Sequence, residues 1–189
     1  LFFIRPQAKR AKNQKTFADI GALGVYRGPG SFTGVRVGIS FATALAYVHK
    51  LPIITVNSLE IMAFKSGFKE SLLVALPAIK GHFYVAGYER IGDKISEKLV
   101  PQSLSQVETM GLKNKFSQFI DGTQLETRPT ASEISRFLKL EARKFEEVSW
   151  NFVKPLYLRR SEAEEKLRAG LLKPIYSESE LQVEPNRKK

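Results

Sequence analysis

Cysteine is absent from this chain of 189 residues, and histidine occurs only as His49 and His82. Without thiols the chain forms no disulfide framework and offers no thiolate nucleophile or thiolate metal ligand. Two histidines this far apart provide neither an HxxxH nor an HExxH pair, and the acidic residues form no recognisable ligand cluster. We therefore expect this chain to hold no metal and to carry no zinc-peptidase chemistry.

Long apolar runs are also missing from the sequence. No segment reaches the roughly 18–20 apolar residues that a membrane-spanning helix requires. No secretory signal peptide is visible at the start of the chain. These absences predict a cytoplasmic protein that does not associate with membranes.

Positive charge is in excess, with 30 lysine and arginine residues against 19 aspartate and glutamate residues and a net charge of +11. Such a charge attracts polyanions by long-range attraction and counterion release, without specificity. Basic residues gather between positions 5 and 15 and again between positions 136 and 144. Two interpretations stay open for this charge, a solvated basic surface and a contact with a polyanion such as RNA.

The most informative segment is the glycine-containing sequence GPGSFTGVRVG, which begins at Gly28. It follows a short apolar run at 20–26 and leads into an apolar run at 35–48, an order that predicts strand, loop and helix. Within it we expect Ser31 and Thr33 to cap the helix start, and Arg36 to brace the loop or to form an interface ion pair. The loop residues singled out are Gly28, Pro29, Gly30, Ser31, Phe32, Thr33, Gly34 and Arg36.

The spacing of this loop differs from three motifs of phosphate binding and nucleophilic catalysis. A P-loop continues from its last glycine with Lys and Ser or Thr, but Val35 follows Gly34. A dinucleotide fingerprint needs G-x-G-x-x-G, and a nucleophile elbow needs glycines where Pro29 and Thr33 flank Ser31. The loop therefore either cradles a phosphate through its backbone N–H groups alone or serves only as a tight turn.

Small residues recur every fourth position from the loop into the predicted helix, at Gly30, Gly34, Gly38, Ala42 and Ala46. Positions four apart lie on one helical face, so these residues form a smooth row that lets another backbone approach closely. The remainder of the helix is apolar on nearly all sides, which is typical of a helix buried on all sides. Two interpretations follow, a central core helix or a helix with one face packed against a second protein.

The GPGSFTGVRVG segment and the alanine-containing helix after it closely resemble the signature of the TsaB (YeaZ) family. The likeness continues through 17–25 and 51–60, and Pro155-Leu156-Tyr157-Leu158-Arg159 resembles the family's closing Pro-x-Tyr-Leu-Arg. The resemblance is strong from about 17 to 59 and thin but ordered from there to 159. It implies an α/β fold of duplicated actin/heat-shock-ATPase-like (ribonuclease-H-like) domains, with the first domain truncated at its N-terminus.

The resemblance also implies a function. Members of this family are regarded as non-catalytic subunits of the bacterial machinery that makes threonylcarbamoyladenosine in tRNA. They pair with and activate the catalytic paralogue TsaD, the ATPase TsaE joins them, and tRNA is met through the complex. The oligomer formed by the chain alone stays open, with a homodimer as one possibility. ATP or ADP and metal are then expected on the partner subunits, with none held by this chain.

One departure concerns the beginning of the chain. The family starts with a strand ending in Asp-Thr-Ser, then a hairpin and a helix, whereas this chain starts within the region of that helix. We expect preceding residues to be missing and Leu1 to Ile4 to be a helix remnant. The predicted partner interface joins this remnant to the small-residue row and comprises Leu1, Phe2, Ile4, Gly34, Gly38, Phe41, Ala42, Leu45 and Ala46.

The pattern of apolar residues predicts a mixed α/β chain in two blocks with a boundary near 67–71. We expect an incomplete actin-like domain at 1–68, a second α/β domain at 69–160 and a charged, flexible tail at 161–189. Further strands are expected at 52–56, 71–76, 82–88, 94–100 and 116–120, and further helices at 58–66, 104–110, 130–142 and 161–168.

The sequence is compatible with three other functions. The first is an active ATPase of the actin and sugar-kinase superfamily, whose phosphate-binding aspartate would precede the chain. The second is a glycoprotease, against which the lack of metal ligands argues. The third is an RNA-binding module, which only the charge suggests.

Overall fold

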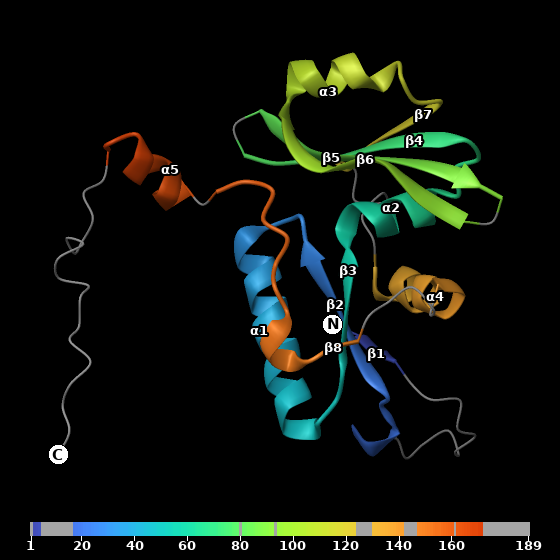
Figure 1. The fold of residues 1–189 in the computed structure, drawn as a ribbon, viewed down its shortest axis with the longest axis vertical. Coiled ribbons are helices and arrows are strands. Elements are labelled where there is room, and N and C mark those ends of the chain that lie inside the picture. Colours follow the sequence, from blue (N-terminus) through green and yellow to red (C-terminus); the bar gives the residue numbers. More distant parts are fainter. Residues whose placement is uncertain are drawn as a thin grey trace. The chain divides into compact units, whose positions relative to one another are not determined.

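The computed structural model describes residues 2–4, 17–79, 81–92, 94–123, 130–141, 147–160 and 162–171. Within these ranges, the part of the chain up to Leu158 contains two sheets of four strands each, and the described residues from Arg159 onward belong to a separate unit with helix α5 (Glu162–Arg168). Figure 1 shows the two sheets with their helices. The predicted α/β class is confirmed.

The first sheet has the strand order β1-β2-β3-β8, with β1 at Phe2–Ile4, β2 at Ala22–Gly28, β3 at Ile53–Asn57 and β8 at Glu147–Val148. A short 3-10 helix η1 (Phe17–Asp19) precedes β2. Strands β2 and β3 are parallel, whereas β1 pairs antiparallel with β2 and β8 pairs antiparallel with β3. The crossover between the two parallel strands is helix α1 (Phe32–His49), as a parallel connection requires.

The prediction of a helix at Leu1 to Ile4 is wrong. Residues 2–4 form strand β1, in which Phe3 lies opposite Leu23 of β2, and Leu1 lies outside the described residues. A run of so few apolar residues carries no periodicity that separates helix from strand. The aromatic and β-branched side chains of the Phe-Phe-Ile run suit a strand.

Side chains alternate between the two faces along β2 and β3, and each face of this sheet carries a hydrophobic cluster. Leu23, Val25 and Ile53 face α1 and form one cluster with Ile39 and the alanines of that helix. Tyr26, Ile54 and Val56 belong to a second cluster with helix α2 (Ser58–Ser66) and helix α4 (Ala131–Glu141). Because side chains alternate along a strand, helices cover the sheet on both faces, as Figure 1 shows.

Helix α2 has the termini that its sequence predicts. The Asn57 side chain accepts a hydrogen bond from the Leu59 N–H at 2.9 Å, and Gly67 ends the helix with a left-handed backbone at φ +64°. Asparagine as N-cap and glycine at the C-terminal cap satisfy backbone groups that a helix leaves unpaired.

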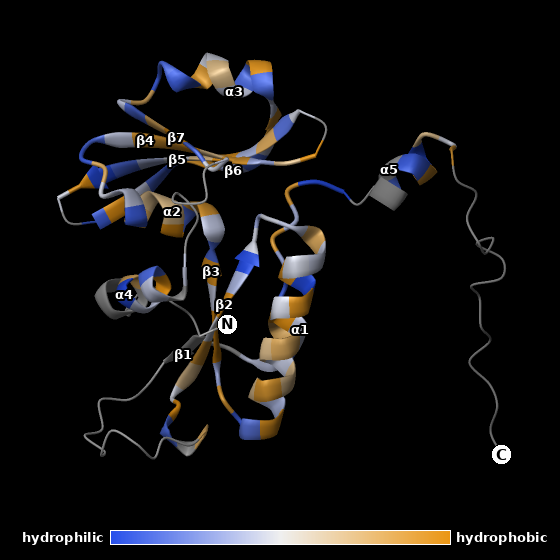
Figure 2. Ribbon diagram, turned by 180° about the vertical axis from the view of Figure 1, so that it is seen from behind, coloured by the Kyte–Doolittle hydropathy of each residue, from blue (hydrophilic) through white to orange (hydrophobic). Residues whose placement is uncertain are grey.

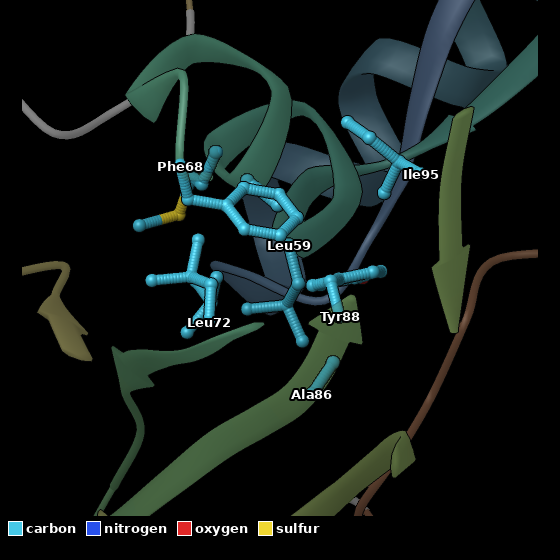
Figure 3. Packing of buried hydrophobic residues seen from close by; sticks show 9 residues of the cluster. Leu59, Phe68, Leu72, Ala86, Tyr88 and Ile95 are labelled. Carbon is cyan, nitrogen blue, oxygen red and sulfur yellow. The ribbon is translucent and has the colours of Figure 1, made fainter. Parts of the chain in front are cut away.

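The second sheet has the order β6-β5-β4-β7 and is formed by β4 (Ser71–Pro77), β5 (His82–Ile91), β6 (Lys94–Ser105) and β7 (Gln118–Asp121). Helix α2 covers one face and helix α3 (Gln106–Lys113) the other (Figure 1). Figure 3 shows the core beneath α2, where Leu59 and Phe68 pack on Leu72, Ala86 and Tyr88.

Residues after the second sheet return to the first. Helix α4 packs Ile134 and Phe137 against Val56 and Ile61, and β8 extends the edge of β3. Beyond β8, the 3-10 helix η3 (Trp150–Phe152) contacts α1. The chain passes from the first sheet to the second at 67–71, where a boundary is expected. The prediction of a second domain at 69–160 does not include the packing of α4 and β8 against the first sheet.

Helix α4 begins with a hydrogen bond between Thr130 and Glu133 that forms one half of a capping box. The Thr130 N–H donates to the Glu133 carboxylate at 2.8 Å, and the Thr130 carbonyl accepts a hydrogen bond from the Tyr26 hydroxyl at 3.4 Å. The hydrogen bond from the Thr130 side chain is the main cause that lowers the pKa of Glu133, and Lys65 adds to it. The cap therefore joins α4 to β2 as well as to its own first turn.

The lowered pKa of Glu133 predicts a pH-dependent contribution to stability. A carboxyl whose pKa is lower in the folded state stabilises the fold above its unfolded pKa, and this contribution is lost as the pH falls through the folded value. We expect Glu133→Ala to lower the free energy of unfolding by about 0.5–1 kcal/mol near neutral pH. Urea unfolding should show this difference shrinking in acid; a difference independent of pH would contradict the role of the charge.

A second prediction concerns Gly87 in the middle of β5. A Cβ at this position would overlap with the ring of Phe116 and would lie 2.8 Å from the Leu99 Cβ. Gly87→Ala should therefore destabilise the fold by about 1–3 kcal/mol through overpacking. Gly111→Ala in α3 is the matched control, because nothing lies within 4 Å of the place that its methyl group would take and alanine favours helix. Equal unfolding midpoints for the two variants would contradict this packing.

Candidate functional site

The glycine loop lies between β2 and α1, as the sequence predicts, and the chain from 155 to 158 crosses it. Gly28 has φ +102°, and a Cβ there would lie 3.2 Å from the Leu156 carbonyl oxygen. The Leu156 N–H donates to the Arg27 carbonyl at 2.6 Å. Gly28 thus meets both needs expected of a loop glycine, a positive φ and the close approach of another backbone.

The start of α1 is capped from within the loop. The Ser31 side chain accepts a hydrogen bond from the Gly34 N–H at 3.3 Å, which confirms Ser31 as the N-cap, and Thr33 is exposed in the first turn. A helix N-terminus binds anions through such N–H groups. The Gly34 N–H is satisfied by the Ser31 side chain, as an N-cap requires.

A cavity of about 550 Å³ opens beside this loop. Tyr26, Gly30 and Ser31 line it together with Ser58 of α2 and Leu76 of β4. Burial, with the Glu133 carboxylate as a second cause, raises the pKa of Tyr26 far above its usual value, so its hydroxyl remains protonated at neutral pH. The described part of the chain contains no group of three histidine, cysteine, aspartate or glutamate residues able to hold a metal ion.

The row of small residues on α1 turns inward. Ala42 and Ala46 are fully buried against β2 and β3, and a Cβ at Gly38 would lie 4.0 Å from Val25 Cγ2. Leu45 is half-buried and packs on the same cluster. Only Gly34, at the loop end of the row, is exposed. The small residues thus bring the helix close to its own sheet, which is the core-helix interpretation.

The opposite side of α1 is exposed and largely apolar, and we call it the outward face. Two rows of residues spaced four apart form it. Val37 is 63% exposed, Phe41 57% and Val48 67%. Figure 2 shows the apolar colouring that runs along this helix. The outward face comprises Thr33, Val37 and Phe41 in one row and Arg36, Ser40, Ala44 and Val48 in the other.

Aromatic residues that sequence reasoning missed continue this apolar surface. The ring of Tyr47 meets that of Trp150 edge-on at 5.0 Å, and η3 contacts α1. Tyr47 is 54% exposed and Phe152 65%. The isolated aromatics at 150 and 152 give no periodic signal, and only the folded chain places them beside α1.

Arg36 joins the loop, helix α1 and residues 155–158, which we call the crossing segment. Its Nε–H donates to the Tyr157 hydroxyl at 2.8 Å, and its guanidinium carbon lies 3.9 Å from the centre of the Phe32 ring. The rings of Phe32 and Tyr157 are 5.1 Å apart. Arg36 therefore braces the loop against the crossing segment, one of the two roles expected for it.

Of the other residues predicted for the interface, Phe2 and Ile4 lie in strand β1, and Leu1 lies outside the described residues. Phe41 is on the outward face, whereas Ala42 and Ala46 are on the inward side. Within the described ranges, no helix is long and apolar enough to cross a membrane.

Comparison with known proteins gives a consistent result. Residues 7–132 match the model of the family described as TsaD, tRNA N6-adenosine threonylcarbamoyltransferase. The chain is 32% identical over 132 residues to the tRNA threonylcarbamoyladenosine biosynthesis protein TsaB of Buchnera aphidicola from Acyrthosiphon pisum, across 65% of this chain and 60% of that protein. It is 44% identical over 78 residues to TsaB of Escherichia coli K12, across 40% of this chain and 34% of that protein.

A solved structure has the same fold. An uncharacterised Pseudomonas aeruginosa protein with similarity to peptidase YeaZ superposes with a TM-score of 0.64 at 20% identity, across 76% of each chain. These comparisons confirm the predicted actin/heat-shock-ATPase-like fold class. The chain spans about 60% and about a third of the two curated relatives' lengths.

The inward packing of the small-residue row gives a stability prediction. Ala42→Leu should lower the free energy of unfolding by about 1–3 kcal/mol, because the site is fully buried against the sheet. Ala44→Leu, on the exposed side of the same helix, makes the same change of side chain and should stay within about 0.5 kcal/mol of the unchanged chain. Thermal or urea unfolding measures both; similar losses would contradict the assigned helix orientation.

Proposed function

The chain belongs to the TsaB/YeaZ family, and from this membership we propose that it is a non-catalytic partner subunit in the synthesis of threonylcarbamoyladenosine in tRNA. Its relatives from Buchnera and Escherichia coli are named as biosynthesis proteins for this modified nucleoside. In this proposal the chain pairs with and activates a TsaD-type catalytic paralogue. A TsaE-type ATPase joins the pair, and tRNA is bound through the complex.

The observation that carries the proposal is the outward face of α1. Large apolar side chains on it are more than half exposed at Val37, Phe41 and Val48. Contiguous exposed apolar surface of this kind marks interaction sites in proteins that are otherwise polar outside. Aromatic side chains such as Phe41 and Tyr47 are typical of the centre of a protein–protein interface.

The chemistry of the described residues agrees with a supporting role. The loop N–H at Gly34 is already satisfied by Ser31. The one titratable side chain that lines the cavity, among the described residues, is Tyr26, which is neutral near pH 7 at its ordinary pKa and stays so because burial raises that pKa further. We therefore assign ATP or ADP and metal to the partner subunits. Without a partner, the same outward face would pair two copies of this chain.

The test is the affinity of this chain for the TsaD-type subunit of the same organism, measured by isothermal titration calorimetry. Phe41→Asp places a charge in the apolar face and should weaken binding by roughly a hundredfold or more, because that carboxylate would be desolvated without a partner. Val107→Asp is the matched control, since Val107 is 82% exposed on helix α3, away from the outward face.

Light scattering of the same mixtures gives the stoichiometry. A complex formed by the unchanged chain and by Val107→Asp, but lost with Phe41→Asp, supports the proposal. No complex with the unchanged chain, or full binding by a folded Phe41→Asp variant, would contradict it.

A further inference from the structure

The cluster around Arg36 holds a cation in one orientation at one end of the outward face. The guanidinium is stacked on Phe32 and is held through its Nε–H by the Tyr157 hydroxyl. Arginine has five N–H donors, so this hydrogen bond leaves the four on its terminal nitrogens. Arg36 is exposed, and so is Tyr157 at 44%.

No carboxylate of the described residues forms an ion pair with this guanidinium. Helix α1 contains no acidic residue in any of its 18 positions. A cation near a helix N-terminus also gains nothing from the helix dipole, which favours negative charge there. Neither an ion pair with a described carboxylate nor the helix dipole therefore explains a cation at this place.

The position of Arg36 on the helix links it to the apolar surface. Arg36 shares its row with Ser40, Ala44 and Val48, at intervals of four residues. In the two rows of the outward face it is the single charged residue. Surfaces that bind RNA carry several cations to meet successive phosphates. A single guanidinium in a fixed orientation beside an apolar face instead matches a protein partner that places one carboxylate opposite it.

The crossing segment places Tyr157 beside Arg36. The Leu156 N–H is bonded to the Arg27 carbonyl, and the Leu156 carbonyl occupies the space above Gly28 that a side chain would need. This fixes Tyr157 next to the loop, 121 residues away from Arg36 in the chain. Fixing the arginine before binding reduces the side-chain entropy lost on association.

We propose that Arg36 is the charged anchor of the outward face and receives a carboxylate of the TsaD-type subunit, and that Tyr157 is its positioning residue. The inference rests on the proposed function, because the partner is the one named there. Planar guanidinium binds carboxylate in a bidentate manner, which fixes the register of two helical surfaces as well as adding affinity.

The experiment measures the dissociation constant for the purified TsaD-type subunit at low and moderate salt. Arg36→Gln should weaken binding about tenfold to a hundredfold at low salt, and less at moderate salt as screening weakens the pair. Arg36→Lys keeps the charge without the planar fork and should be intermediate. The control is Arg136→Gln, which removes the same charge from an exposed position on α4 and should change binding less than about twofold.

Tyr157→Phe keeps the ring on Phe32 and removes only the hydroxyl that holds Arg36. It should weaken binding about threefold to tenfold in the unchanged chain, and have no further effect in the Arg36→Gln background. A purely structural role for Tyr157 would give the same loss in both backgrounds. Thermal unfolding of each variant verifies that the fold is retained.

The outcomes separate this inference from the proposed function. If Phe41→Asp disrupts the complex while Arg36→Gln binds like Arg136→Gln, the proposed function stands and the anchor is overturned. If Arg36→Gln lowers the retention of tRNA and leaves the subunit affinity unchanged, the anchor is overturned as well. If the unchanged chain does not bind the subunit, both fall.

Discussion

Close packing of helix α1 on its sheet is the constraint from which the rest of the structure follows. Ala42 and Ala46 are fully buried between the helix and strands β2 and β3, and Gly38 meets Val25 on the same side. Since small residues take up this side of the helix, its larger side chains at Val37 and Phe41 are left outside. The row that admits a close neighbour thereby determines which face is offered to a second protein.

The glycine loop connects this packing to the end of the folded unit. Gly28 lets the Leu156 carbonyl approach, and Tyr157 then meets Phe32 and Arg36 at the start of α1. Two segments that resemble separate parts of one family signature are thus a single contact in the fold. In our account, the contact prepares one end of the outward face for a charged partner.

Much of the fold could be predicted from the sequence, and the exceptions have physical causes. Cap residues such as Asn57 and Gly67 mark the two ends of α2 in the sequence, and the folded chain has the helix ends at these residues. The orientation of α1 could not be predicted, because apolar residues surround the helix and a smooth row suits a sheet as well as a partner. Strand β1 could not be predicted, because three residues are too few to show a helical or strand periodicity. The contact between Arg36 and Tyr157 spans 121 positions and has no local signal at all.

If a partner covers the outward face of α1, a thiol placed there is protected in the complex, and labelling tests this directly because the chain has no cysteine of its own. Ser40→Cys places a single thiol in the exposed row, and Val107→Cys places one on α3 as the reference. We expect a saturating concentration of the TsaD-type subunit to slow the maleimide reaction at position 40 and to leave the reaction at position 107 unchanged. An equal rate at position 40 with and without bound subunit would contradict it.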